Sequence, residues 1–375
     1  MALYPKLILD ALAQVRYPGT GKNLVEAGMV DEDIHIEGSK VSLSLIFDKP
    51  NDPFMKSVVR AAEAAIEAFV GEPVEIRGNI AVKAKQAPRP EPEKLLPKVK
   101  NIIAVSSGKG GVGKSTVSAN LAVALARMGY KVGLLDADVY GPSMPKMFGI
   151  EDARPYLEEV DGRELIAPAE SHGVKLLSVG FFVDPRNATV WRGSMAGNAL
   201  KQLIADANWG ELDYFLIDLP PGTSDIHLTV VQTLALTGAV VVSTPQEVAL
   251  ADARKGIDMF RNEKVNVPVL GLVENMAWFT PAELPENRYY LFGREGVKRL
   301  AEEMQVPLLA QIPIVQSICE AGDNGSPIAL SEDSLTGQAF MALAEAVVVQ
   351  TELRNATQPA TKRVEVTQHG AGHKH

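Results

Sequence analysis

Residues 102–116 read Ile-Ile-Ala-Val-Ser-Ser-Gly-Lys-Gly-Gly-Val-Gly-Lys-Ser-Thr. The apolar beginning predicts a buried strand, the glycines that follow predict a tight loop, and residues 116–128 predict a helix. Residues 108–115 match the phosphate-loop pattern Gly-x-x-x-x-Gly-Lys-Ser/Thr, and the strand and helix that this pattern requires flank it. In such a loop, backbone N–H groups and the N-terminal end of the helix bind phosphate oxygens. The segment therefore predicts a nucleotide-binding site in an α/β domain.

The polar side chains of this loop predict how a nucleotide is held. We expect Lys114 to lie along the β- and γ-phosphates and the Ser115 hydroxyl to complete the shell of a Mg²⁺ ion. A chance glycine turn between a strand and a helix is the alternative interpretation. The residues expected to bind ATP here are Gly108, Lys109, Gly110, Gly111, Val112, Gly113, Lys114, Ser115 and Thr116.

Length, charge and cysteine content exclude several classes of protein. A chain of 375 residues is long enough for one large domain plus a smaller one, or for two of medium size. The net charge of −9 argues against a nucleic-acid partner, and no apolar run approaches the length that spans a membrane. The N-terminus lacks the apolar core of a signal peptide, and a single cysteine, Cys319, excludes an intramolecular disulfide. We therefore expect a cytoplasmic protein that binds neither nucleic acid nor membrane.

The composition along the chain predicts two domains and two irregular segments. Residues 1–83 contain two helical patterns and short strands, including one at 74–76, which predicts a small α/β domain. Residues 84–99 are rich in proline and charge, and such a linker stays extended without packing. Residues 100–353 form the second domain. Residues 354–375 are polar, and we expect them to be disordered.

The second domain alternates strands and helices, which predicts a mostly parallel sheet covered by helices on both faces. The last helix is expected at 334–353. Ligands of such sheets lie beyond the carboxyl ends of the strands, which is where the remaining polar motifs fall. After the first strand, the apolar strand candidates are 132–135, 175–179, 214–217, 239–242 and 269–273, with a further one near 307–309.

Two acidic motifs follow predicted strands at this edge of the sheet. Asp136 and Asp138 come directly after the second strand, and their i, i+2 spacing points both carboxylates the same way. One of them can support the magnesium shell while the other orients an attacking water, and a pair of capping aspartates is the alternative. Asp218 ends the strand at 214–217, where a carboxylate holds Mg²⁺ in phosphate-loop enzymes. The amide of Gly222 is then expected to approach the γ-phosphate.

Together these motifs resemble the Mrp/ApbC family of iron–sulfur carrier ATPases. Lys109 is a second lysine in the loop, similar to the deviant phosphate loop that this family shares with MinD, ParA and the nitrogenase iron protein. Asp136–Ser143 and Asp218–Asp225 read Asp-Ala-Asp-Val-Tyr-Gly-Pro-Ser and Asp-Leu-Pro-Pro-Gly-Thr-Ser-Asp, which is similar to the Mrp branch. Trp191–Met195 also resembles that branch. Residues 1–83 resemble the small domain of iron–sulfur assembly factors.

The resemblance implies a homodimer and assigns roles to the site residues. In this family the early lysine, here Lys109, crosses the dimer interface to the nucleotide of the second protomer, where a cation stabilises phosphoryl charge. By resemblance, Asp138 polarises the attacking water and Asn275 binds the adenine ring. The expected catalytic residues are Lys109, Lys114 and Asp138, and the expected magnesium ligands are Ser115, Asp136 and Asp218.

The chain departs from the family pattern at its cysteines. Relatives place a Cys-x-x-Cys shortly after the Asn-Met pair found here at 275–276, and two such pairs across the dimer would ligate a 4Fe–4S cluster. Residues 277–287 contain no cysteine, so Cys319 is the one candidate thiolate ligand. Two Cys319 residues from a dimer supply only two thiolates, which is short of a set of four. The ligands of a bound cluster are therefore left open by the sequence.

The sequence thus predicts a homodimeric ATPase that depends on ATP and Mg²⁺, hydrolyses slowly, and carries iron–sulfur clusters to apoproteins. Apo iron–sulfur proteins and assembly factors are the partners that the resemblance implies. One alternative is a nucleotide-gated adaptor of the same family that holds no cluster itself, which the absent cysteine pair favours. The other is a positioning ATPase similar to MinD or ParA, whose marks would be a basic amphipathic C-terminal helix or a basic patch.

Overall fold

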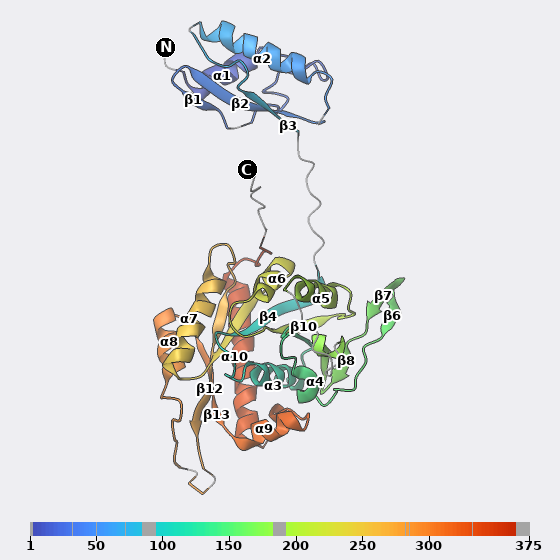
Figure 1. Cartoon of the computed structure of the whole chain (residues 1–375), viewed down its shortest axis with the longest axis vertical. Helices are drawn as coiled ribbons and strands as arrows, with labels where there is room; N and C mark the ends of the chain where they lie inside the picture. Colours follow the sequence, from blue (N-terminus) through green and yellow to red (C-terminus); the bar gives the residue numbers. More distant parts are fainter. Residues whose placement is uncertain are drawn as a thin grey trace. The chain divides into compact units, whose positions relative to one another are not determined.

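The computed structural model of the chain contains two compact units, residues 1–93 and 94–375 (Figure 1). Each unit has a hydrophobic core of its own. Among the residues described, no helix is both long enough and apolar enough to cross a bilayer. The structure describes residues 3–31, 33–49, 51–71, 73–84, 95–182, 193–281, 283–284, 286–331 and 333–364.

The first unit is a three-stranded sheet with two helices. Its elements are α1 (Pro5–Leu12), β1 (His35–Glu37), β2 (Lys40–Phe47), α2 (Met55–Val70) and β3 (Ile80–Ala84). The central strand β2 pairs antiparallel with β1 and parallel with β3. Apolar side chains at helical spacing, such as Ile8, Leu12 and Ile66, are fully buried together with Leu45 and Phe47 of β2. Burial of these side chains in one cluster stabilises the unit.

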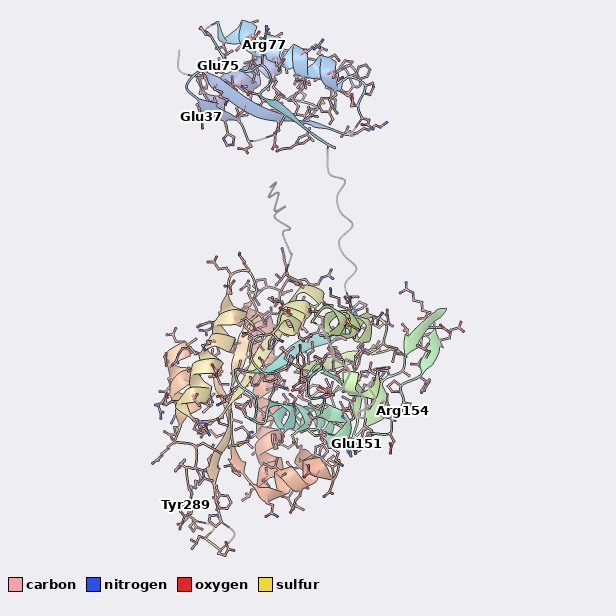
Figure 2. The ribbon with its side chains drawn as sticks, viewed as in Figure 1. Glu37, Glu75, Arg77, Glu151, Arg154 and Tyr289 are labelled. Atoms are coloured by element: carbon pink, nitrogen blue, oxygen red, sulfur yellow. The ribbon has the colours of Figure 1, made fainter. Side chains whose placement is uncertain are left out.

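The last strand of this sheet lies later in the chain than the predicted strand at 74–76. Glu75, labelled in Figure 2, makes only an isolated bridge with Lys40. Its backbone exchanges hydrogen bonds with Ser39 and Val41, at the turn between β1 and β2. Gly78 then takes a left-handed conformation with φ of 78°, which turns the chain before β3 begins. Residues 74–76 therefore precede the last strand and are not part of it.

The second unit is built on an eight-stranded sheet with the order β13-β12-β11-β4-β10-β5-β9-β8. The strands are β4 (Val99–Ser107), β5 (Val132–Asp136), β8 (Ala169–Ser171), β9 (Val174–Ser178), β10 (Leu212–Asp218), β11 (Gly238–Ser243), β12 (Val269–Phe279) and β13 (Leu308–Ile314). A separate antiparallel hairpin consists of β6 (Leu157–Val160) and β7 (Arg163–Ile166). Only the pair β8–β9 of the large sheet is antiparallel, so the predicted mostly parallel sheet is confirmed.

Helices cover both faces of this sheet (Figure 1). They are α3 (Lys114–Arg127), α4 (Met144–Met147), α5 (Gly193–Ala205), α6 (Asp225–Thr233), α7 (Glu247–Arg261), α8 (Gly296–Met304), α9 (Gln316–Asp323) and α10 (Leu335–Thr357), with short 3-10 turns η1 (Val179–Phe182) and η2 (Ile328–Leu330). The crossover through α3 leads from β4 towards β5, and the crossover through α7 leads from β11 to β12 in the opposite direction. Because parallel crossovers are right-handed, α3 and α7 lie on opposite faces. Helix α10 packs beside α3, and α8 packs beside α7.

Strand β12 is longer than the predicted strand at 269–273. It continues to Phe279, with a shift of register against β13 between Asn275 and Phe279. Met276 takes a left-handed backbone conformation within this shift, with φ of 55°. An irregularity of this kind bends a strand without ending its pairing. Glu274, Asn275 and Met276, which follow the predicted strand, therefore lie inside β12.

The C-terminal helix also extends beyond its predicted end. Helix α10 continues to Thr357, and the Arg354 side chain donates to the carbonyl of Pro359 at 2.8 Å. The chain then reaches Val364, whose N–H donates to the Val231 carbonyl in α6. Residues 354–364 therefore pack on the second unit, which differs from the predicted disordered tail. Residues 365–375 lie outside the described part of the chain.

Candidate functional site

The phosphate loop lies between β4 and α3, at the carboxyl edge of the sheet. Gly111 and Gly113 take left-handed conformations, with φ of 82° and 80°, which residues with a Cβ rarely adopt. Gly113 is the N-cap residue of α3, so the N-terminal end of that helix opens onto the loop. The helix begins at Lys114, two residues before the predicted start. This geometry suits an anion, because loop amides and the helix dipole both favour negative charge.

The first glycine of the loop is required by a close approach to α7. A Cβ on Gly108 would lie 2.1 to 2.4 Å from backbone atoms of Asp252 and Ala253, whereas a Cβ on Gly110 would meet Pro221 at 3.8 Å. We expect Gly108→Ala to lower the free energy of unfolding by about 1–3 kcal/mol, because the loop or α7 must move. The matched control Gly110→Ala should change it by no more than about 0.5 kcal/mol. Urea unfolding measures both, and equal losses would contradict this explanation.

A buried ion pair lies at the base of the loop. Lys114 Nζ donates to Asp218 Oδ2 at 2.7 Å, and both side chains are buried. The Ser115 hydroxyl donates to the same oxygen at 2.7 Å, and the Ser118 hydroxyl donates to Asp218 Oδ1 at 2.5 Å. Sequence reasoning missed Ser118, although its spacing of four from Lys114 places it on the same face of α3. The end of β10 is thus tied to the first turn of the helix.

Asp136 lies beside this pair, because β5 and β10 place Asp136 and Asp218 in register at their ends. The Asp136 carboxylate is buried and accepts from Ser178 Oγ at 2.9 Å and from Met144 N at 3.2 Å. Burial, followed by the charge of Asp218, raises the pKa of Asp136 above its usual range, and the two hydrogen bonds oppose this shift. Two carboxylates with the Ser115 hydroxyl are hard oxygen donors, so the residues present fit Mg²⁺.

The other predicted catalytic residues lie nearer the surface. Asp138 is half-buried just beyond β5, accepts from Tyr140 N at 3.3 Å, and has its pKa raised by burial. The Lys109 side chain is exposed, while its carbonyl accepts from Ser107 Oγ at 3.1 Å. The Gly222 amide, expected near the γ-phosphate, donates instead to the Ser107 carbonyl at 2.8 Å. The loop that follows β10 is thus hydrogen-bonded to the end of β4.

Sequence reasoning also missed a buried histidine in this region. His227 on α6 is 1% exposed, and its Nε2 lies 3.4 Å from Ser106 Oγ on β4. Its Nδ1 accepts from the backbone N–H of Ser224 at 3.2 Å. Burial, and next the charge of Lys114, lower the pKa of His227 to about 4, so the ring is neutral near pH 7. The one signal for this contact in the sequence is that His227, a polar residue, follows three positions after Ser224, the N-cap of α6.

The buried histidine predicts a loss of stability in mild acid. Between pH 6.5 and about 4 the unfolded state binds a proton at His227 that the folded state does not, so the titration of this group lowers the free energy of unfolding as pH falls. Complete titration through this window amounts to about 3 kcal/mol. We expect His227→Gln to lose less stability than the wild type between about pH 7 and pH 5. Urea titrations followed by tryptophan fluorescence measure this difference, and parallel losses would contradict it.

A cavity of about 440 Å³ opens beside the C-terminal part of the phosphate loop. Asn275, predicted to bind adenine, lines it and donates from Nδ2 to the Val112 carbonyl at 2.8 Å, which braces the loop. Several apolar side chains and this amide together suit a flat, polar-edged base. The lining residues that bear on this argument are Gly113, Thr116, Met276, Pro313, Ile318 and Cys319.

Residues 277–281 and 286–291, which follow Met276, form an arm held by backbone pairing and ring contacts. Phe279 pairs in antiparallel fashion with Tyr289, which is labelled in Figure 2, through two hydrogen bonds of 2.8 Å. The Arg288 guanidinium lies 4.4 Å from the centroid of the Trp278 ring. Across the described ranges, no three His, Cys, Asp or Glu side chains are grouped as a metal site. The arm is therefore stabilised by backbone pairing and ring contacts and offers no thiolate.

The structure brings most of the predicted site residues to one edge of the sheet. The contacts above link the phosphate loop to Asp136, Asp218 and Asn275 at this edge. The positive charge of Lys114 also acts on Asp138, where it opposes the rise in pKa that burial causes. Cys319 is exposed on α9, with its Sγ 3.8 Å from a carboxylate oxygen of Asp323. Trp191 and Arg192 of the predicted segment lie outside the described residues. The chemistry of these groups suits phosphates, a divalent ion and a base.

Comparison with known proteins agrees with this chemistry. The family model described as NUBPL iron-transfer P-loop NTPase matches residues 98–348, and the model described as iron-sulfur cluster assembly protein matches residues 6–77. An iron-sulfur cluster carrier protein of Synechocystis is 42% identical over 342 residues, 91% of this chain and 96% of its own. A protein of the same name from Escherichia coli is 50% identical over 67% of each chain. A solved nucleotide-binding protein from Archaeoglobus fulgidus, in complex with ADP, is 40% identical with a TM-score of 0.55, covering 63% of this chain and 90% of its own.

Proposed function

This chain belongs to the family of iron-transfer P-loop NTPases, and we propose that it is a homodimeric, magnesium-dependent ATPase that carries iron–sulfur clusters to apoproteins. The hydrogen-bonded set of Lys114, Ser115 and Asp218 at the phosphate loop carries the nucleotide part of this proposal. The cluster part rests on the name of relatives that match nearly the whole chain. Apo iron–sulfur proteins and assembly factors are the proposed partners, and the cytoplasm is the proposed location.

The residues of the site divide the work of hydrolysis. The loop amides and the Lys114 ammonium bind the phosphates of ATP, and Lys109 reaches the nucleotide of the second protomer. Ser115, Asp136 and Asp218 would hold Mg²⁺, which supplies positive charge to the phosphate oxygens when bound. Asp138, half-buried beside them, orients the attacking water in its ionised form.

The loop that begins after Asp218 supports the proposal of slow hydrolysis. Its Gly222 amide donates a hydrogen bond to the Ser107 carbonyl, and this bond must break before the amide can approach a γ-phosphate. A loop that is held by the γ-phosphate and released after hydrolysis acts as a switch. Phosphate release measured with Mg²⁺ and with excess EDTA tests this function. Turnover that needs Mg²⁺ is expected, and no turnover under either condition would contradict the proposal.

A second candidate function is a nucleotide-gated adaptor that holds no cluster itself. The observation that favours it is the absence of cysteine from residues 277–291, together with the single exposed Cys319. A 4Fe–4S cluster is commonly held by four thiolates, whereas a dimer of this chain supplies two. The adaptor would pass on the nucleotide state of the switch without binding iron.

Anaerobic reconstitution with iron and sulfide distinguishes the two candidates. Iron and sulfide per dimer and the visible spectrum are measured for the wild type and for Cys319→Ser. A stoichiometric cluster that the variant loses would support a carrier whose site is incompletely ligated by cysteine. A cluster that survives would point to non-cysteine or external thiol ligands. No cluster in either protein, with ATP hydrolysis intact, would contradict the carrier and support the adaptor.

A further inference from the structure

Besides the hydrogen bond from the Leu219 amide to the Val105 carbonyl at 3.0 Å, two links join the loop after β10 to the end of β4. We call residues 219–224 the switch loop. The first link is the hydrogen bond from the Gly222 amide to the Ser107 carbonyl at 2.8 Å. The second link runs through His227, whose ring lies between the end of the switch loop and Ser106. Because these serines are the last two residues of β4, both links end directly at the start of the phosphate loop.

The hydrogen bonds of His227 determine its tautomer. Nδ1 lies 3.2 Å from both the backbone nitrogen and the hydroxyl oxygen of Ser224. Since an N–H only donates while a hydroxyl can also donate, a ring without a proton on Nδ1 satisfies both contacts. The proton of the neutral ring is therefore on Nε2, which lies 3.4 Å from the Ser106 hydroxyl oxygen and can donate to it. A protonated ring would set an N–H against the N–H of Ser224. The ring thus acts as a neutral bridge with a defined acceptor and a defined donor.

We propose that His227 is a positioning residue for ATP hydrolysis, which holds the switch loop in register with the phosphate loop. The inference rests on the proposed ATPase function. His227 does not contact the nucleotide in this account, because it acts through Ser224 on one side and Ser106 on the other. Because the ring is buried, bulk water does not compete for these bonds. Without the ring, the hydrogen bonds of Leu219 and Gly222 to β4 would remain, and neither holds Ser224 at the far end of the loop.

Three substitutions separate the two bonds of the ring. His227→Asn keeps an acceptor near the position of Nδ1 but is too short to reach Ser106. His227→Gln reaches toward Ser106 but misplaces the acceptor, and His227→Leu removes both bonds at similar volume. The matched control is Thr233→Val on the same helix, which removes a hydroxyl bonded to the Thr229 carbonyl at 2.6 Å and leaves both loops untouched.

We expect His227→Leu to lower kcat for ATP hydrolysis about 10- to 100-fold, because small misplacements of positioned groups cost rates of this order. His227→Asn should show a smaller loss, and Thr233→Val should keep the wild-type kcat. The Kd for ADP should be unchanged in all four variants, since the switch loop is assigned to the terminal phosphate that ADP lacks. A merely structural role would lower the melting temperature and the ADP affinity together and leave kcat per folded molecule unchanged.

A double substitution tests whether the serine acts through the histidine. If Ser106 contributes only through this ring, Ser106→Ala should slow hydrolysis in the wild type but cause no further loss in His227→Leu. Additive losses in the two backgrounds would overturn the proposed bridge. A wild type without hydrolysis would refute the proposed ATPase function instead. Normal kcat in the wild type and in every His227 variant would refute the positioning role alone.

Discussion

Replacement of Lys114 by methionine is expected to lower kcat for ATP about 10²- to 10³-fold, because a preorganised positive charge at the transferring phosphoryl group is removed. The side chain is buried at the base of the phosphate loop, where no other lysine or arginine contacts Asp218 among the described residues. Phosphate release under saturating ATP measures the effect. Lys131→Met is the matched control, since this exposed lysine pairs with Glu211 on the surface. Comparable losses in both variants would contradict the role of Lys114.

The same substitution is expected to destabilise the nucleotide-free protein. Removing Lys114 leaves the Asp218 carboxylate buried beside Asp136, and breaking a buried ion pair on one side costs about 3–5 kcal/mol. The double variant Lys114→Met with Asp218→Asn removes the unpaired charge and should recover part of this loss. Urea unfolding at constant pH compares the three proteins. Stability equal to that of the wild type in Lys114→Met would show that the pair contributes little.

The sequence was sufficient to predict the parts of this site where a local motif also specifies the secondary structure around it. Residues 102–116 specify strand, loop and helix at once, because the glycine spacing needs left-handed residues between an apolar strand and a helix. The proximity of Asp136 to Asp218 could also be predicted. Both end apolar strands, and parallel strands present their carboxyl ends at one edge.

Contacts between distant segments were beyond prediction from one sequence. Ser106 and His227 are 121 positions apart, and no sequence pattern around either residue predicts their contact. The bond from Asn275 to the Val112 carbonyl spans 163 positions and depends on the packing of β12 beside the loop. The extension of β12 past residue 273 rests on the left-handed conformation of Met276, which its residue type does not favour. Such features arise from tertiary packing, which overrides local preference.

Replacement of Lys109 by alanine is expected to lower the ATPase rate about 10³-fold while each protomer still binds nucleotide. A cation supplied across an interface contributes rate factors of this order in phosphoryl transfer. The side chain is exposed and its backbone is anchored by Ser107, so alanine should fold normally. Phosphate release, ATP affinity and the ATP-dependent dimer fraction measure the three parts of the expectation. An unchanged rate and dimer fraction would contradict the role assigned to Lys109.

Mixed dimers decide whether Lys109 acts on its own protomer or on the second one. Lys109→Ala keeps its own Asp138, whereas Asp138→Asn keeps its own Lys109, so each homodimer should be inactive. In a mixed dimer, the site on the Lys109→Ala protomer regains a lysine from the second protomer and has an intact Asp138. Equal mixing should therefore restore about one quarter of the wild-type rate, because half of the dimers are mixed and each has one complete site. If the lysine acts within its own protomer, no site in the mixture is complete and the rate stays at background. Recovery on mixing thus requires both the dimer and the crossing of its interface, which neither variant alone can establish.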